Sequence, residues 1–346
     1  RRVYLDNAAT TRVKEKVVES MLPYLTDIYG NPSSVHSIGR DAKRVIDTER
    51  AKIAEILGAK PREIFFTASG SEADNWAIKG VAAANRKKGN HIITTSIEHH
   101  AVLHTCQYLE RQGFEVTYLP VDSYGKVSIE DVEKAVRKDT ILISIMHANN
   151  EIGTIQPIAE IGELAKSKGI PFHTDAVQTT GTIPVNVKDL NVDMLSLSAH
   201  KFHGPKGIGV LYARNGRIGD NLIHGGAQEA NKRAGTENIP YIVGMSTALQ
   251  LAVENMEENR KKVQMLRDDI ISFVLNNIDH VRLNGHPTDR LPGNANFSFN
   301  YIEGESLLLM LDMKGICASS GSACTSGSLD PSHVLLAIGL SHEVAH

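Results

Sequence analysis

The chain has 346 residues, which is enough for two domains, because single hydrophobic cores seldom grow beyond about 250–300 residues. Its 37 Lys and Arg residues against 40 Asp and Glu residues give a net charge of -3, which does not favour a general nucleic-acid-binding or membrane-binding surface. No run of residues approaches the ~18 apolar residues of a membrane span, and the first residues lack the apolar core of a signal peptide. We therefore expect a cytoplasmic protein with neither a membrane nor a nucleic acid as its partner.

Strand-like and helix-like patterns alternate through roughly the first 215 residues. Helical spacing of apolar residues precedes Gly58, which we expect to end a helix. The predicted strands cover residues 63–67, 91–95, 114–118, 140–147, 170–175 and 194–197. This alternation predicts an α/β fold in which helices flank a mostly parallel sheet. Ligands of such sheets bind where the strands end.

The last third of the chain has a different pattern. Residues 238–277 have the pattern of one long helical stretch, and a helix at residues 305–312 lies between strand-like segments at 295–300 and 315–318. Residues 331–346 are helical in pattern and stop without a following strand. We therefore expect a large domain over residues 16–255 and a smaller α+β domain formed by residues 1–15 and 256–346, apparently truncated at its C-terminal end.

The three cysteines form neither a CxxC pair nor a disulfide framework. Cys106 lies in a helical pattern and Cys317 in a strand-like one, so both are expected to pack as small apolar residues. Cys324 lies in a segment rich in Ser and Gly, which is typical of a mobile surface loop. An exposed free thiol favours a reactive role for Cys324.

A lysine follows the predicted strand at residues 194–197. The apolar run stops at Ser198, and Pro205 with three glycines predicts a tight turn directly after Lys201. A desolvated lysine amine is nucleophilic enough to form a Schiff base with a carbonyl group. The alternative, an exposed lysine in a turn, is the more common situation for a lysine considered alone.

Polar clusters follow five of the predicted strands, at residues 69–75, 98–100, 149–153, 175–178 and 198–201. The first of them opens a helix, and a helix N-terminus with free backbone N–H groups binds phosphate, although capping by Ser71 is an equally good explanation. Asp175 ends a buried strand, where a carboxylate needs a cationic partner such as a pyridinium nitrogen. A Schiff-base lysine, a carboxylate and a phosphate site together predict pyridoxal 5'-phosphate.

Six motifs of this sequence resemble those of cysteine desulfurases, which are class V aminotransferase-type enzymes of pyridoxal phosphate fold type I. They occur at residues 4–11 (YLDNAATT), 149–154 (NNEIGT), 173–178 (HTDAVQ), 198–207 (SAHKFHGPKG), 233–236 (RAGT) and 320–325 (SGSACT). The resemblance covers the chain from Tyr4 to its last residue. The cysteine motif is similar to that of the subgroup that serves iron-sulfur cluster assembly.

The resemblance implies roles for individual residues. Lys201 would carry the cofactor as a Schiff base, Asp175 would bind its pyridine nitrogen, and Gln178 would bind its phenolic oxygen. His99 would stack on the ring and move protons, and Asn150 would lie near the phenolic oxygen and the substrate carboxylate.

The phosphate site is implied in the same way. It would consist of Gly70, Ser71, Ser198 and His200, where Ser71 replaces the usual threonine of the family and keeps its hydroxyl group. Thr236 would reach the phosphate of the neighbouring subunit, so the resemblance also implies a homodimer.

The implied reaction converts L-cysteine to L-alanine and leaves a persulfide on Cys324, which is passed to an iron-sulfur cluster scaffold protein. In the family, an arginine shortly after the final helix of this sequence holds the substrate carboxylate. The chain stops before that arginine, so we expect weak turnover from a polypeptide that ends at His346.

Three other functions remain open on the sequence. Selenocysteine lyase activity would need the same residues, whereas another transaminase-like activity would leave Cys324 without a use. A scaffold subunit that only carries sulfur would keep Cys324 and lack the enzymatic activity. A metal site is not expected, because His99, His100 and His104 could share a helix face only in part.

Overall fold

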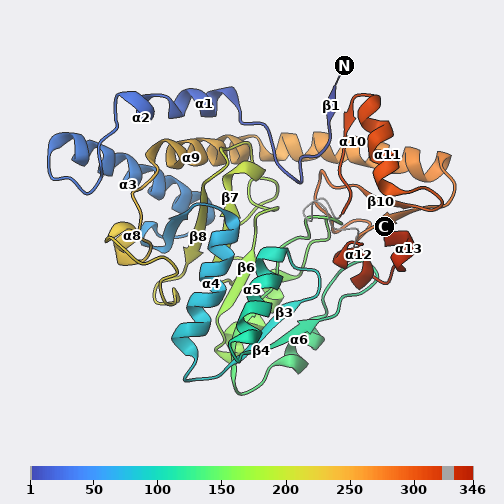
Figure 1. The fold of residues 1–346 in the computed structure, drawn as a ribbon, viewed down its shortest axis with the longest axis horizontal. Coiled ribbons are helices and arrows are strands. Elements are labelled where there is room, and N and C mark those ends of the chain that lie inside the picture. Colours follow the sequence, from blue (N-terminus) through green and yellow to red (C-terminus); the bar gives the residue numbers. More distant parts are fainter. Residues whose placement is uncertain (1, 322–330, 346) are drawn as a thin grey trace.

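The computed structural model describes residues 2–321 and 331–345 of the chain (Figure 1). Its main feature is a seven-stranded sheet in the order β2-β8-β7-β6-β5-β3-β4. The strands are β2 (Ile64–Thr67), β3 (His91–Thr95), β4 (Glu115–Leu119), β5 (Thr140–Ser144), β6 (Phe172–Asp175), β7 (Met194–Ser198) and β8 (Gly209–Ala213). Only β8 pairs antiparallel with its neighbours, so the other six strands run in one direction and end at the same edge.

The expected mostly parallel sheet flanked by helices is therefore confirmed. The helices and 3-10 turns up to residue 254 are α1 (Glu15–Met21), α2 (Pro23–Thr26), α3 (Ser37–Leu57), η1 (Pro61–Glu63), α4 (Gly70–Asn85), α5 (His100–Arg111), α6 (Ile129–Ala135), α7 (Ile158–Lys168), η2 (Ala199–Lys201), α8 (Gln228–Asn231) and α9 (Ile239–Glu254). As expected, α3 ends at Gly58, whose φ of 72° is in the left-handed region that glycine adopts without a steric penalty.

Two hydrophobic cores lie on the two faces of this sheet. Successive residues of a strand point to opposite faces, and accordingly Ile92 and Leu142 belong to one core while Ile93 and Ile143 belong to the other. The first core includes residues of α4 and α5, and the second includes residues of α3, α7 and α9. The sheet is thus held rigidly from both sides.

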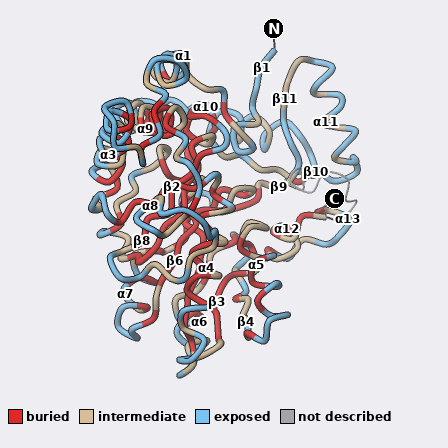
Figure 2. Tube along the Cα trace, turned by 60° about the vertical axis from the view of Figure 1, so that its left-hand side comes forward, coloured by how far each residue is buried: buried red, intermediate tan, exposed pale blue. Residues whose placement is uncertain are grey.

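The remaining elements are β1 (Val3–Tyr4), α10 (Met256–Asn277), β9 (Val281–Asn284), β10 (Asn296–Phe299), α11 (Gly304–Met313), β11 (Ile316–Cys317), α12 (His333–Ala337) and α13 (His342–Ala345). β9 and β10 form an antiparallel pair, and β1 pairs in parallel with β11. The N-terminal segment therefore lies beside residues that are more than 300 positions away in the sequence. Figure 2 shows that exposed residues predominate around β1, β11 and α11, whereas buried residues follow the main sheet.

The prediction of one helix over residues 238–277 is wrong, because the structure has two helices that meet at Asn255. The backbone of Asn255 has φ -108° and ψ 11°, outside the helical region, and its side-chain amide donates to Leu251 O at 2.9 Å. Asparagine favours such local bonds over a continuous helix.

Strand β8 was not predicted, because its first residue lies in the glycine-rich stretch after Lys201. A Cβ atom at Gly209 would lie 2.7 Å from the carbonyl carbon of Ser69 and 2.8 Å from Leu197 O. Glycine is therefore required there by close backbone packing rather than by a turn.

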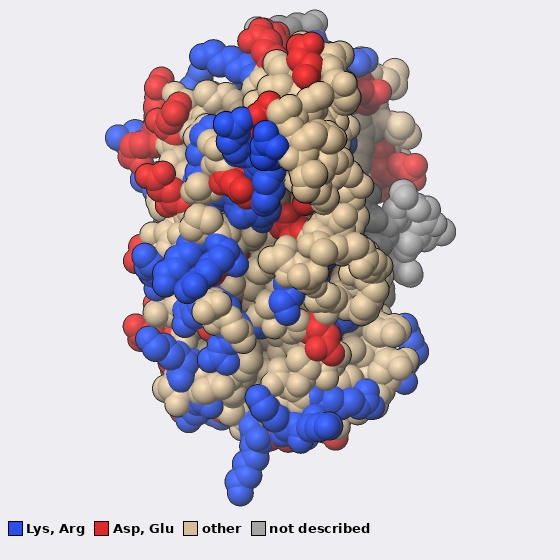
Figure 3. Space-filling model, turned by 90° about the vertical axis from the view of Figure 1, so that its left-hand side faces the viewer, with Lys and Arg blue, Asp and Glu red and all other residues tan. Residues whose placement is uncertain are grey.

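The surface carries both signs of charge. On the face with α3 and α8, Lys and Arg side chains occur in several groups with acidic side chains beside them (Figure 3). Within the described residues, no helix has the length and apolar character needed to cross a membrane.

Candidate active site

Five of the strand ends bring the candidate residues to one edge of the sheet. Asp175 is the last residue of β6, Ser198 is the last residue of β7, and His99 lies shortly after β3. Asn150 follows β5, and Gly70 begins α4 after β2. These strands run parallel in one sheet, with β8 between β2 and β7, so residues far apart in the sequence come to the same edge.

Asp175 is nearly fully buried, with 7% of its surface exposed. The backbone N–H of Val177 donates to its Oδ1 at 2.8 Å, which leaves acceptor capacity for a further donor. Burial raises the pKa of Asp175, while the bond from Val177 and the charge of Lys201 oppose that rise. The carboxylate thus lies close enough to Lys201 to respond to its charge.

Lys201 ends the short turn η2 directly after β7. Its Nζ donates to Ala9 O at 2.9 Å and to Ala8 O. The side-chain amide of Gln178 donates to the same Ala8 O at 3.0 Å. Residues 8 and 9 therefore cover the site, a contact that the sequence reasoning missed although it singled out the motif at residues 4–11.

His99 precedes α5, and its ring Nδ1 accepts from Ala101 N at 3.1 Å. This bond assigns the proton of the neutral ring to Nε2. Burial lowers the pKa of His99 to about 4, and the positive charge of Lys201 contributes in the same direction. The ring is therefore neutral near pH 7, with a hydrogen on Nε2 to donate and its one lone pair, on Nδ1, engaged by the N–H of Ala101.

The candidate phosphate residues cluster only in part. A Cβ atom at Gly70 would lie 2.7 Å from Val177 Cγ2 and 3.4 Å from Ser198 Cβ, so the start of α4 packs against the ends of β6 and β7. Ser71 is exposed, as a phosphate ligand needs to be. The capping alternative for Ser71 is wrong, because Ser69 caps α4 through a bond from Glu72 N at 3.1 Å.

His200 and Thr236 complete the proposed phosphate residues. The ring Nδ1 of His200 lies 3.2 Å from Thr10 Oγ1, at the same N-terminal segment that contacts Lys201. Thr236 is exposed in the stretch between α8 and α9, and within the described part of one chain no hydrogen bond joins it to the other candidates. The structure therefore joins Lys201, Gln178 and His200 through residues 8–10 and places Gly70 beside Ser198. Asn150 and Ser71 lie at the same edge of the sheet, and Cys324 lies outside the described residues.

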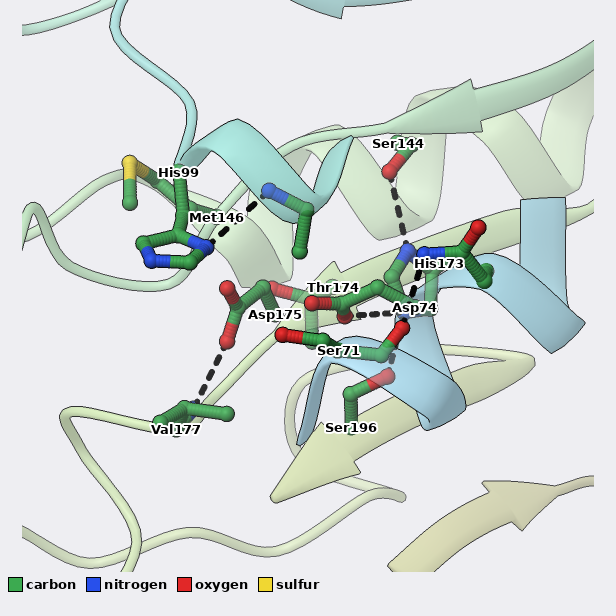
Figure 4. A network of polar contacts seen from close by, with 12 residues as sticks. Ser71, Asp74, His99, Ser144, Met146, His173, Thr174, Asp175, Val177 and Ser196 are labelled. Carbon is green, nitrogen blue, oxygen red and sulfur yellow. Dashed lines mark hydrogen bonds and ion pairs between the residues drawn. The ribbon is translucent and has the colours of Figure 1, made fainter. Parts of the chain in front are cut away.

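A buried polar network supports the strand ends and was not foreseen (Figure 4). His173 lies between Ser144 and Ser196, with each ring nitrogen 2.9 Å from a serine Oγ. Burial lowers the pKa of His173 to about 3 and raises the pKa of Asp74 well above its usual range, with the charge of Asp175 adding to the rise. Burial thus favours the neutral form of both groups, although His173 Nε2 and Asp74 Oδ1 are 3.5 Å apart.

Glu98 is a second unforeseen group. It is fully buried, accepts from Thr95 Oγ1 at 2.6 Å and from Met146 N at 3.0 and 3.1 Å, and so ties the loop of His99 to the end of β5. Burial raises the pKa of Glu98 to about 8. Its position directly before His99 was the available signal in the sequence.

The rings of further histidines near the site contact one another. The rings of His100 and His104 lie 4.8 Å apart, as do those of His100 and His333. Among residues 2–321 and 331–345, no group of three or more His, Cys, Asp or Glu side chains has the geometry to hold a metal ion. Cys106 is buried within α5, as expected.

Comparison with known proteins decides the family. Residues 3–342 match the family described as aminotransferase class-V. This chain belongs to that family. A cysteine desulfurase IscS of Methanosarcina thermophila is 61% identical over 344 residues, which are 99% of this chain and 85% of the relative. Another, from Clostridium botulinum, is 59% identical over 349 residues, or 100% of this chain and 88% of the relative.

The solved structures agree with these relatives. A NifS-like protein superimposes with a TM-score of 0.94 at 44% identity, covering 100% of this chain and 92% of the other. A structure described as SspA in complex with cysteine gives a TM-score of 0.87 at 41% identity, covering 100% and 96% of the two chains. Within the class-V family, the chain therefore belongs to the cysteine desulfurases, and the expectations of fold type I and of pyridoxal phosphate as cofactor are confirmed.

Proposed function

We propose that this chain releases sulfur from L-cysteine, forms L-alanine, and holds the sulfur as a persulfide on Cys324. The observation that carries the proposal is that the charge of Lys201 acts on both Asp175 and His99, so that an amine, a buried carboxylate and a neutral imidazole share one site. The relatives named cysteine desulfurase IscS support the same reaction.

The residues present fit pyridoxal phosphate. Asp175 is a buried carboxylate with acceptor capacity left for a cationic ring nitrogen, and the start of α4 at Gly70 and Ser71 offers backbone N–H groups to a phosphate. Lys201 would hold the cofactor covalently, and Ser198, His200, Gln178 and Asn150 would bind its polar groups. When bound, the cofactor withdraws electrons from the substrate carbon next to the amino group.

His99 and Lys201 would then transfer protons to and from the substrate. The lowered pKa of His99 keeps its ring neutral, so Nδ1 would take a proton from an incoming substrate amine or thiol once it releases the bond from Ala101 N. The amine of Lys201, once displaced by substrate, would move a proton from the substrate α-carbon.

Cys324 would complete the reaction. Its thiolate attacks the sulfur of the bound substrate, a sulfur–sulfur bond forms, and the carbon–sulfur bond breaks with its electron pair left on the substrate. Protonation of that carbon gives L-alanine, and Cys324 keeps the persulfide. No further oxidant is needed, because the carbon gains the electron pair that the transferred sulfur gives up.

We further propose that the enzyme works as a homodimer in which Thr236 reaches the phosphate of the partner subunit. Exposed apolar side chains between α1 and the start of α3 support a contact of this kind, among them Leu25 with 57% and Val35 with 88% exposure. The persulfide would be passed to an iron-sulfur cluster scaffold protein in the cytoplasm. We also propose a large domain of residues 16–255 and a small domain of residues 1–15 and 256–346.

The proposal is tested by incubating the purified protein, loaded with pyridoxal phosphate, with L-cysteine and a thiol reductant. We expect equimolar L-alanine and sulfide, a persulfide on Cys324, and a loss of at least about a thousandfold in turnover for Lys201→Ala. Cys324→Ser is expected to retain the absorbance change on cysteine binding and to lose sulfide release. Full sulfide release from Cys324→Ser would overturn the proposed role of that thiol.

A further inference from the structure

Arg233 forms a two-point ion pair with Glu72, an acid in the first turn of α4. Its Nε donates to Glu72 Oε1 at 2.8 Å, and its Nη2 donates to Glu72 Oε2 at 3.1 Å. The two side chains are 19% and 13% exposed, so water and salt screen this pair only weakly. The bond to Glu72 raises the pKa of Arg233. The pair therefore cancels the negative charge of Glu72 at the start of α4.

Glu72 lies directly after the two residues of α4 that would bind the cofactor phosphate. Its Oε2 also accepts from Ala68 N at 2.8 Å, and its own backbone N–H donates to Ser69 Oγ at 3.1 Å. One carboxylate thus bonds both the backbone of the turn between β2 and α4 and the guanidinium of Arg233. A displaced Glu72 would release this turn.

A second ion pair fixes the segment that carries Arg233. Arg50 Nη1 and Nη2 donate to Glu229 Oε2 and Oε1 at 2.7 and 2.6 Å, and Glu229 Oε2 also accepts from Phe66 N of β2 at 2.9 Å. Glu229 and Ala230 have left-handed backbone angles, with φ of 48° and 54°. Such angles are costly for residues other than glycine and persist only where other contacts hold the chain. The segment before Arg233 is therefore anchored to the same strand that leads into α4.

The charge of Glu72 matters because of where the phosphate would bind. The N-terminal end of a helix carries a partial positive charge, which attracts both a bound phosphate and an acid in the first turn. A Glu72 carboxylate without its cation would repel the phosphate dianion beside it. Paired with Arg233, the carboxylate keeps its bond to Ala68 N while its charge is largely cancelled.

We propose that Arg233 is a positioning residue for the cofactor phosphate, because its pair with Glu72 neutralises the acid beside the phosphate and holds the turn that binds it. This inference rests on the phosphate site proposed above at the start of α4. Each of the three guanidinium nitrogens of Arg233 already donates, two of them to Glu72 and Nη1 to Ala234 O at 3.2 Å. Arg233 thus acts through Glu72 rather than by touching the phosphate.

The test measures how tightly the enzyme, stripped of its cofactor, takes up pyridoxal phosphate and pyridoxal, which lacks the phosphate. The absorbance of the lysine-bound cofactor follows both titrations. In Arg233→Met, which removes the charge, we expect the Kd for pyridoxal phosphate to rise about tenfold, within the range for a charge at a helix N-terminus. The Kd for pyridoxal should stay close to that of the wild type. If Arg233→Met fails to fold, Arg233→Gln takes its place with the same expected result.

A double variant separates the neutralisation of Glu72 from any other role of Arg233. Adding Glu72→Gln to Arg233→Met removes the unpaired negative charge and keeps an oxygen for Ala68 N. We expect the affinity for pyridoxal phosphate to return most of the way to that of the wild type. A direct bond from Arg233 to the phosphate, or an effect through Thr236 in a partner subunit, would not be restored in this way.

Arg214→Met is the matched control. Arg214 also pairs with an acid, Asp193, at 3.3 Å, but this pair adjoins the start of β7 and the end of β8, at the opposite edge of the sheet. We expect Arg214→Met to leave the Kd of both ligands unchanged. An unchanged Kd for pyridoxal phosphate in folded Arg233→Met, an equal loss for pyridoxal, or no recovery on adding Glu72→Gln would overturn the inference. A wild-type protein that binds pyridoxal as tightly as pyridoxal phosphate would instead overturn the proposed phosphate site.

Discussion

The adjoining helices α9 and α10 have opposite relations to the core. Nine residues of α9 are buried against the main sheet and its helices, whereas Arg267 is the single buried residue of α10. Large apolar side chains of α10 remain exposed, including Phe273 at 64% and Met265 at 57%. Most of the buried apolar surface therefore lies around the seven-stranded sheet, and α10 adds little to it.

The candidate active-site residues that the structure describes all precede residue 255, on the well-packed side of this comparison. Its buried polar groups, such as Asp175 and Glu98, have raised pKa values because the surrounding strands and helices exclude water. A rigid sheet is able to hold such groups at fixed distances, which loosely packed helices would not. The contrast between the two regions predicts different responses to substitution.

The largest effect is expected for Phe172→Ala in β6. Phe172 is fully buried in the core that includes α3, α7 and α9. Removing its ring should lower the free energy of unfolding by about 3–5 kcal/mol, since both the burial of the ring and its packing contacts are lost. Urea denaturation followed by circular dichroism measures this loss. Phe172→Leu is the control and should cost clearly less, and a loss below about 1 kcal/mol for Phe172→Ala would contradict the assignment of the core.

A smaller, pH-dependent effect is expected for Glu98→Gln. The pKa of Glu98 is raised by burial to about 8 in the folded protein, above the usual 4.5 of a glutamate. Below pH 4.5 the Glu98 carboxyl group is protonated in both the folded and the unfolded protein. Between pH 4.5 and about 8 the folded protein keeps this proton and the unfolded protein releases it. The stability that this acid contributes is therefore lost as the pH rises toward 8.

Glutamine cannot lose a proton, so the stability of Glu98→Gln should gain on that of the wild type as the pH rises from 5 to 8. Urea denaturation of both proteins at several pH values measures the difference. Glu133→Gln is the control. Glu133 is exposed, and its ion pair with Lys168 at 3.0 Å lies at the surface rather than in the buried network. A stability difference between Glu98→Gln and wild type that stays constant with pH would contradict the raised pKa.

The strands and their polar ends were predictable because local signals specify them. Apolar runs predicted six of the seven main strands, and Gly58 predicted the end of α3. The antiparallel β8 and the network of Asp74 and His173 were not predicted, because they depend on close contacts between distant segments. The break at Asn255 was also missed, although it depends on a local bond to Leu251. The contact of Lys201 with Ala8 joins residues 193 positions apart, and no local pattern encodes it.

The smallest effect is expected for Phe273→Ser in α10. Phenylalanine and serine have similar helix propensities, so the substitution tests burial rather than helix formation. Because Phe273 is 64% exposed, its loss should change the free energy of unfolding by less than about 1 kcal/mol. The matched change in α9 is Leu249→Ser, which places a hydroxyl group at a fully buried position and should cost several times more. Equal losses for the two variants, measured by urea denaturation, would show that α10 is covered in solution and would remove the contrast between the two helices.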